Sequence, residues 1–154
     1  RLLKSNIYCA DFETTGYQNL KTDGEVRVWL WSLINVETKQ AWNGRVSAIF
    51  TDRQKSKVQS NYFHNLAFDG HFILDYALRN NIPISCLIDG KSKIFYKFDL
   101  TLGCDKVEFR DSLKKFPTSL QGLSVQLGIQ GKNEKPDFNR YIPATYQPTL
   151  SEIQ

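Results

Sequence analysis

The sequence contains no methionine, only three cysteines and only two histidines among its 154 residues. Cys9, Cys86 and Cys104 are widely spaced, odd in number and without a Cys-x-x-Cys pair, so neither a zinc cluster nor a disulfide scaffold is expected. A reduced, intracellular setting fits this cysteine usage best. Because the sequence begins with Arg and lacks methionine, we expect it to be a fragment of a longer protein.

Long apolar runs and a signal peptide are also lacking. The uncharged apolar stretches are far shorter than the roughly 20 residues that span a membrane, so no membrane contact is expected. The length fits one domain, and 41% hydrophobic residues are enough to form a core, which argues against disorder. The net charge of +4 is compatible with a polyanionic partner but does not establish one.

The hydrophobic pattern predicts a mixed sheet with helices, of the α/β or α+β class. Strands are expected at residues 6–12, 27–36, 40–45, 60–63, 92–98 and 106–110. Helices are expected at residues 47–59, 69–80 and 113–127, the last with an uncertain start because of Pro117. The first strand is apolar on both alternating faces, which is typical of the middle of a sheet. Beyond residue 131 the polar, proline-punctuated sequence predicts loop rather than core.

Two acidic residues, Asp11 and Glu13, lie at the end of the first predicted strand. Because side chains alternate across a strand, both carboxylates leave on one face, together with Ile7 and Cys9. Paired carboxylates beside apolar side chains repel each other and are costly to bury, and a divalent cation would remove both penalties. Carboxylate oxygens favour Mg²⁺ or Mn²⁺. A solvent-exposed strand end gives the same short pattern, so both interpretations stay open at this point.

A second polar and aromatic group follows the strand predicted at 60–63. There the chain carries His64 and Asn65 into a turn and then Asp69 to the start of a predicted helix. Asp69 could simply cap that helix. This role does not explain the His-Asn pair, whose donors suit phosphate and base contacts, or the aromatic neighbours, which suit stacking on unpaired bases. Those neighbours are Tyr62, Phe68 and Phe72.

Three motifs, in this order, resemble those of a known family. Asp-Phe-Glu-Thr-Thr (residues 11–15) resembles the first exonuclease motif of proofreading 3′–5′ exonucleases, and Phe-His-Asn-Leu-Ala-Phe-Asp-Gly (residues 63–70) is similar to their second motif. Asp-Ser-Leu-Lys-Lys-Phe-Pro (residues 111–117) resembles the Ser-Leu motif of protein-primed family B DNA polymerases from bacteriophages and linear or mobile elements. The resemblance covers the chain from about Ile7 to its end.

This resemblance implies a ribonuclease H-like α/β fold, a mixed β-sheet flanked by helices, with one exonuclease domain over residues 1–154. It implies that two divalent cations, Mg²⁺ or Mn²⁺, serve hydrolysis of the 3′-terminal phosphodiester of single-stranded DNA, as proofreading in a DNA-directed DNA polymerase used in replication. The implied partners are a single-stranded 3′ end, primer-template DNA and a terminal priming protein. The implied location is the cytoplasm of a cell that carries the phage, plasmid or mobile element.

The resemblance also assigns roles to individual residues. Asp11, Glu13 and Asp69 match the metal-binding carboxylates. The residues that match contacts to the single-stranded DNA end are Thr14, Tyr62, His64, Asn65, Phe68, Phe72, Ser112, Leu113 and Lys114, with Lys115 as a further phosphate contact. The family places a catalytic lysine before an Asp-aromatic pair, and two lysines, Lys132 and Lys135, stand before Asp137-Phe138.

One family motif has no counterpart in the sequence. The third motif, Tyr-x-x-x-Asp on a late helix, does not occur, although Thr149 and Glu152 are spaced like a capping box at the start of such a helix. The palm motifs of DNA synthesis do not occur either. We therefore expect a chain that is incomplete at its carboxyl end, lacks the polymerase domain and one ligand of the nuclease site, and is weak or inactive as an isolated fragment.

Two alternatives stay open. The first is a stand-alone 3′–5′ exonuclease of the same superfamily; those with a catalytic histidine late in the chain are disfavoured because His64 and His71 both lie in the middle. The second is a catalytically incomplete module that binds single-stranded nucleic acid. The gene sequence downstream would test the first alternative, and a metal-dependent nuclease assay the second.

Overall fold

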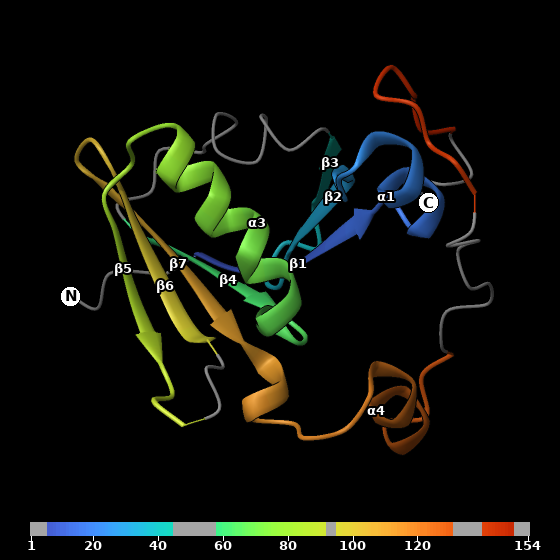
Figure 1. Ribbon diagram of the computed structural model, residues 1–154. Coiled ribbons are helices and arrows are strands. Elements are labelled where there is room, and N and C mark those ends of the chain that lie inside the picture. The colour runs from blue at the N-terminus through green and yellow to red at the C-terminus, as the bar shows by residue number, and fades with distance from the viewer. Residues whose placement is uncertain (1–5, 45–57, 92–94, 131–139, 150–154) are drawn as a thin grey trace.

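The computed structural model describes residues 6–44, 58–91, 95–130 and 140–149. Within these ranges one sheet of seven strands has the order β3-β2-β1-β4-β7-β6-β5 (Figure 1). The strands are β1 (Asn6–Thr14), β2 (Val28–Asn35), β3 (Ala41–Gly44), β4 (Val58–Phe63), β5 (Ile84–Ile88), β6 (Phe95–Leu102) and β7 (Asp105–Asp111). The helices are α1 (Tyr17–Asp23), α3 (Leu66–Arg79), the 3₁₀ turn η1 (Ser112–Lys114) and α4 (Leu120–Gln126).

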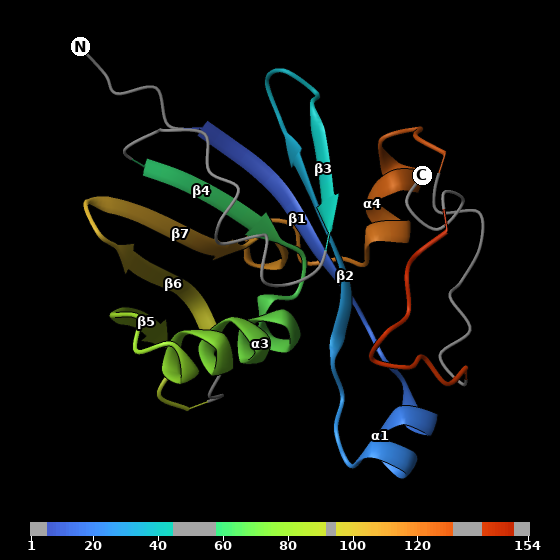
Figure 2. The ribbon, with the colours of Figure 1, turned by 90° about the horizontal axis from the view of Figure 1, so that it is seen from above.

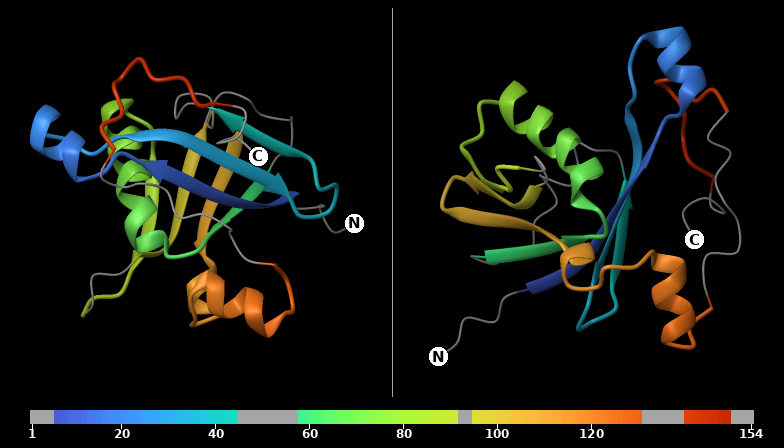
Figure 3. Two further views of the ribbon diagram at one scale, coloured as in Figure 1. Left: turned by 90° about the vertical axis from the view of Figure 1, so that its right-hand side faces the viewer. Right: turned by 60° about the horizontal axis from the view of Figure 1, so that its bottom comes forward.

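The centre of the sheet is parallel and its margins are antiparallel. β4 pairs in parallel with β1 on one side and with β7 on the other. β2 and β3 extend the β1 side by antiparallel pairing, and β6 and β5 extend the β7 side in the same way. The sheet is strongly twisted, so that β1 and β2 run across the direction of β5 and β6 (Figure 3). This is a mixed sheet flanked by helices, as the sequence predicts.

The core lies between the sheet and α3, which covers β6 and β7 (Figure 2). Phe63, Phe98 and Phe109 are completely or almost completely buried on this face of the sheet. From the helix, Ile73 and Ala77 project onto them at a spacing of four residues, which places both on one side of α3. Phenylalanine side chains of the sheet therefore form the centre of this contact layer.

Gly70 allows α3 to approach the sheet closely. A Cβ atom at this position would lie 2.5 Å from Cε2 of Phe98, far inside van der Waals contact. The glycine that ends the second motif thus has a packing role, and it fixes how near the first turn of α3 stands to the sheet.

The face of the sheet turned away from α3 differs from the expectation for β1. Tyr8, Ala10 and Phe12 are buried, but Ile7 is 41% exposed on the alternate face, next to an exposed Cys9. The prediction that this strand lies in the middle of the sheet is confirmed, since β2 and β4 flank β1, but only one face of β1 is buried because no described helix packs on the other. The carboxylates of β1 consequently sit beside solvent rather than beside a second core.

Further along the same face, charged side chains form an ion-pair network across β6 and β7. Glu108 is paired with Arg110, with Lys106 at 3.3 Å and with Lys97 at 3.6 Å. Asp99 contacts the same two lysines, at 2.9 Å for Lys97 and 3.1 Å for Lys106. Alternation along the strands explains the arrangement, since these residues interleave with the buried phenylalanines of the other face.

Several predicted elements require correction. The helix predicted at 69–80 begins three residues earlier, at Leu66, with Asn65 as its N-cap, so Asp69 is not the cap. The helix predicted at 113–127 is divided around Pro117 into η1 and α4 because proline interrupts helical hydrogen bonding. Of the helix predicted at 47–59, residues 47–57 lie outside the described residues, and Val58 and Gln59 belong to β4. The sequence patterns missed α1 and β5 altogether.

Candidate active site

The carboxyl ends of the three parallel strands meet at one edge of the sheet. Cys9 of β1 is level with Tyr62 of β4, and Phe63 of β4 is level with Asp111 of β7. The end of β1, the β4–α3 turn and the β7–η1 turn therefore lie side by side. Each of the three sequence motifs runs through one of these junctions, so the fold brings together segments that are about 50 residues apart in sequence.

Asp69 is the buried member of an acidic group at this edge. It lies in the first turn of α3, is 5% exposed, and burial raises its pKa to about 7. The negative charges of Asp11, Glu13 and Asp111 contribute to the rise, while the backbone N–H of Asp69 opposes it. Carboxylates of β1 and β7 therefore lie near enough to raise the pKa of Asp69 on α3.

The donor chemistry of this group fits hard divalent cations, which the resemblance implies. Carboxylate oxygens are the preferred ligands of Mg²⁺ and Mn²⁺, and both causes of the raised pKa of Asp69, burial and the neighbouring negative charges, would be offset by a bound cation. Within the described ranges, no three His, Cys, Asp or Glu side chains are arranged closely enough to hold an ion in common.

Asp111 joins two of the three motif segments. Its Oδ1 accepts hydrogen bonds from the backbone N–H of Asn65, at 3.1 Å, and of Leu113, at 2.9 Å. The residue is 5% exposed, and its other oxygen, Oδ2, is buried without a hydrogen-bond partner. Asp111 begins the motif at residues 111–117, but the sequence analysis assigns it no role. Its position at a strand end, directly before a Ser-Leu turn, was the available signal.

His64 makes a second link between the same segments. Its Nε2 lies 2.8 Å from the carbonyl oxygen of Thr118, and its Nδ1 lies 3.1 Å from Oγ of Ser112. The hydroxyl of Ser112 is also 3.0 Å from the carbonyl oxygen of Phe63. Both ring nitrogens of His64 are thus engaged within the protein, and its predicted contact to DNA stays a prediction.

Aromatic and basic side chains form contacts on the motif segments and next to them. Phe68 is 50% exposed, and Phe72 packs edge-on against it with ring centroids 5.7 Å apart. Nζ of Lys115 lies 5.3 Å from the centre of the Tyr62 ring. Exposed aromatic faces and cations of this kind suit unpaired bases and phosphates. A further pair was not predicted from sequence: Lys114 lies over the ring of Tyr96, with Nζ 4.8 Å from its centre. Lys132 and Lys135 lie outside the described residues.

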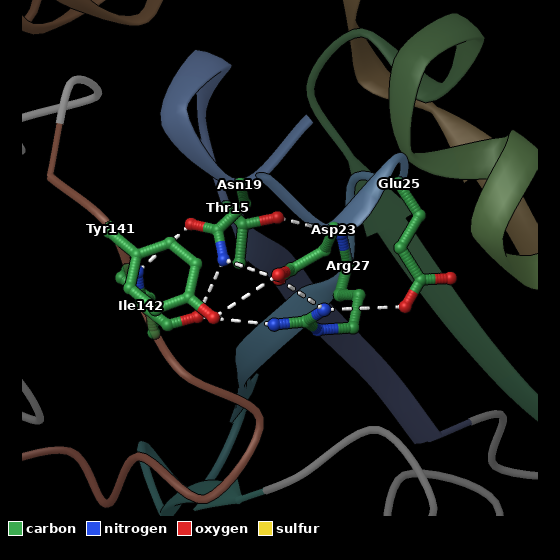
Figure 4. A network of polar contacts seen from close by, with 7 residues as sticks. All are labelled: Thr15, Asn19, Asp23, Glu25, Arg27, Tyr141 and Ile142. Atoms are coloured by element: carbon green, nitrogen blue, oxygen red, sulfur yellow. Dashed lines mark hydrogen bonds and ion pairs between the residues drawn. The ribbon is translucent and has the colours of Figure 1, made fainter. Parts of the chain in front are cut away.

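The end of β1 is held by a separate polar network (Figure 4). Thr15, directly after the strand, donates its backbone N–H to the carbonyl of Arg27 and accepts the backbone N–H of Arg27 with its hydroxyl. The guanidinium of Arg27 reaches Asp23, at 2.8 Å, and the carbonyl of Ile142, at 3.1 Å. The fully buried Asn19 contacts the same carbonyl. Residues 140–149 are therefore attached beside the junction that carries Glu13 and Thr14.

The fold and the arrangement of strand ends define a ribonuclease H-like α/β protein, and comparison with known proteins agrees. The structure of phi29 DNA polymerase complexed with single-stranded DNA matches 97% of this chain with a TM-score of 0.84 and 24% sequence identity. Its complex with primer-template DNA matches with a TM-score of 0.82. In both cases the match covers 28% of the polymerase chain. No protein-family model matches the sequence.

Sequence relatives are phage DNA polymerases. The DNA polymerases of Bacillus phages PZA and phi29 are each 29% identical over 95% of this chain, and that of Streptococcus phage Cp-1 is 28% identical over 70% of it. The chain spans about 27% of the length of the two Bacillus phage relatives. The chain is thus similar to phi29-type DNA polymerases in sequence and in fold, which confirms the resemblance drawn from its motifs.

Proposed function

We propose that this chain is a 3′–5′ exonuclease domain that removes the terminal nucleotide from single-stranded DNA, as the proofreading activity of a replicative DNA polymerase. The observation that carries the proposal is the buried Asp69, whose pKa is raised by burial and by the charges of Asp11 and Glu13. A carboxylate buried beside other negative charges is unfavourable in itself, and function gives a reason to keep it there.

The acidic group would hold two divalent cations through Asp11, Glu13 and Asp69. When bound, such cations polarise a phosphate and lower the pKa of a bound water. The contribution of the chain is to fix the carboxylates on rigid elements, two on a central strand and one on the first turn of a helix. Catalysis of this kind depends on positioning and charge neutralisation, so it requires no nucleophilic serine or cysteine.

The surrounding side chains would hold the DNA end. Phe68, which precedes Asp69 in α3, is half exposed. The ring of Tyr62 on β4 lies under the ammonium group of Lys115, which follows η1. Both aromatic faces suit stacking on bases that have left a duplex. A mispaired primer end unstacks more readily than a paired one, so a site that accepts only unstacked strand favours removal of errors. The matched phi29 polymerase structures contain single-stranded or primer-template DNA, which supports DNA as the ligand.

The proposal is tested with single-stranded DNA labelled at its 5′ end and supplied with Mg²⁺ or Mn²⁺. Because the third exonuclease motif does not occur in this sequence, we expect slow shortening, with labelled products that lose nucleotides stepwise from the 3′ end. The double variant Asp11→Ala, Glu13→Ala should show no shortening, while Asp75→Ala, which loses only an exposed ion pair with Arg79, should act as the unchanged chain does. Equal shortening by the double variant would overturn the site assignment.

A second candidate function is single-strand binding without hydrolysis. It is favoured by one observation, that within the described part of the chain no three ligands are arranged to hold a metal ion in common. Under this alternative the chain binds labelled single strands, but added Mg²⁺ or Mn²⁺ produces no shortening. Shortening of labelled single-stranded DNA in the presence of Mg²⁺ or Mn²⁺ therefore distinguishes the two functions.

A further inference from the structure

We infer that Asp111 is a positioning residue that holds the β4–α3 turn and the β7–η1 turn together as one surface for the DNA end. The inference rests on the proposed function for its ligand, single-stranded DNA, and on the structure for the positioning itself. Asp111 lies at the last position of β7, on the same face of the sheet as the fully buried Phe63, with which it is level.

One carboxylate oxygen of Asp111 accepts two hydrogen bonds from different segments. Oδ1 of Asp111 receives the backbone N–H of Asn65 and the backbone N–H of Leu113, at 3.1 and 2.9 Å. These donors belong to segments whose residue numbers differ by 48, and no hydrogen bond of ordinary secondary structure joins them. Both Asn65 and Leu113 occupy positions for which the sequence motifs predict contact with DNA.

The start of α3 needs a hydrogen-bond acceptor from outside the helix. The first N–H groups of a helix lack partners within it, and Asn65, the N-cap, makes no side-chain cap hydrogen bond. Asn65 also has a left-handed backbone, with φ of 74° and ψ of 56°, a conformation that asparagine adopts more readily than other residues except glycine. Asp111, from another strand, supplies the acceptor that this turn lacks. The hydrogen bond from Asn65 to this carboxylate therefore fixes the turn in its observed position.

A second contact, between His64 and Ser112, also joins the two turns. His64 precedes Asn65 and lies 3.1 Å from the hydroxyl of Ser112, which follows Asp111. Two consecutive residues of one turn thus contact the other turn through two independent sets of atoms. Because Asp69 stands four residues after Asn65 on the same rigid helix, a shift of the turn would also move the acidic group.

The experiment compares Asp111→Ala with Asp111→Asn in the full chain. Alanine removes the acceptor, whereas the asparagine carbonyl keeps an acceptor but no charge. Asp75→Ala serves as the matched control because it removes only the exposed ion pair with Arg79. Amide hydrogen exchange is measured at Asn65 and Leu113. Binding is measured from the fluorescence anisotropy of a 5′-labelled single-stranded oligonucleotide, in EDTA so that metal-dependent hydrolysis does not occur.

In Asp111→Ala we expect both amides to exchange at least about tenfold faster and binding to weaken by about tenfold, as loss of hydrogen bonds to a charged acceptor implies. Asp111→Asn should restore both properties, and this variant also tests the inference if the alanine variant does not fold. Unchanged amide exchange in Asp111→Ala would overturn the inference. So would loss of protection in Asp111→Asn, since charge rather than hydrogen bonding would then be responsible. If the amides respond as expected but the unaltered chain binds no single strands, the positioning is supported and the proposed function fails.

Discussion

Asn19 and Ile142 are joined by a reciprocal pair of hydrogen bonds between a side-chain amide and a peptide group. Nδ2 of Asn19 donates to the carbonyl of Ile142 at 2.6 Å, and the backbone N–H of Ile142 donates to Oδ1 of Asn19 at 2.9 Å. The residues are 123 positions apart in the sequence, and both are buried. The side-chain amide of Asn19 thus pairs with both backbone groups of Ile142, as a neighbouring strand would.

Replacement of Asn19 by alanine should destabilise the chain because it leaves the N–H and carbonyl of Ile142 with fewer partners in a buried place. We expect a loss of about 1–3 kcal/mol in the free energy of unfolding, measured by urea denaturation. Asn80→Ala is the matched control, since the amide of Asn80 bonds an exposed carbonyl at the end of α3. An equal effect of the two substitutions would show that residues 140–149 contribute nothing through this pair.

Gly70 offers a test of the packing that places the acidic group. A Cβ at this position meets Phe98 at 2.5 Å, so Gly70→Ala must displace either α3 or the ring. We expect a loss of about 1–3 kcal/mol in thermal or urea unfolding, the range for overpacked cores. Gly90→Ala is the control, because a Cβ there meets no atom within 4 Å. Unchanged stability of Gly70→Ala would mean that the helix does not depend on this close approach.

The ion-pair network around Glu108, on the face of the sheet turned away from α3, predicts that the stability of the fold depends on pH. Burial of Glu108 opposes ionisation, but hydrogen bonds from Arg110 and Lys106 outweigh it and lower its pKa to about 2. Since the ordinary value is 4.5, the folded state binds fewer protons than the unfolded state between these values. The stabilisation by Glu108 is therefore complete above pH 4.5 and is lost as the pH falls toward 2.

Glu108→Gln isolates this effect from the other acidic groups. At pH 7 the variant should be less stable than the unaltered chain by about 1–3 kcal/mol in urea unfolding, and the difference should disappear near the acid limit. Asp75→Asn, on the exposed surface of α3, provides a matched loss of one carboxylate. A difference between Glu108→Gln and the unaltered chain that persists at low pH would contradict the assignment.

The central strands and the three motif segments were predictable from the sequence because local patterns carry them. Apolar residues on both alternating faces identified β1, and Pro117 marked the point where the predicted late helix is divided. The role of Asp111 was not predictable in this way, since its partner Asn65 belongs to another strand end. The exposure of Cys9 was missed for a related reason, because a strand pattern does not reveal whether a helix covers both faces.

Asp69→Asn provides the sharpest test of the acidic group, because it should act in opposite directions on stability and on excision. In EDTA at pH 8 the carboxylate of Asp69 is buried near the negative charges of Asp11 and Glu13. A neutral amide of similar shape removes that repulsion, so the free energy of unfolding should rise by about 1–3 kcal/mol. Asp75→Asn, which lies on the exposed side of the same helix, should give no such gain.

Addition of Mg²⁺ or Mn²⁺ should then reverse the order of stability. A cation that binds only the folded chain stabilises it by mass action, and the unaltered chain, with its full set of carboxylates, should gain more than Asp69→Asn. The same substitution should abolish shortening of labelled single-stranded DNA. If Asp69→Asn instead lowered stability in EDTA, the carboxylate would be held by favourable contacts, and the case for a cation-binding group at the ends of β1, β4 and β7 would be lost.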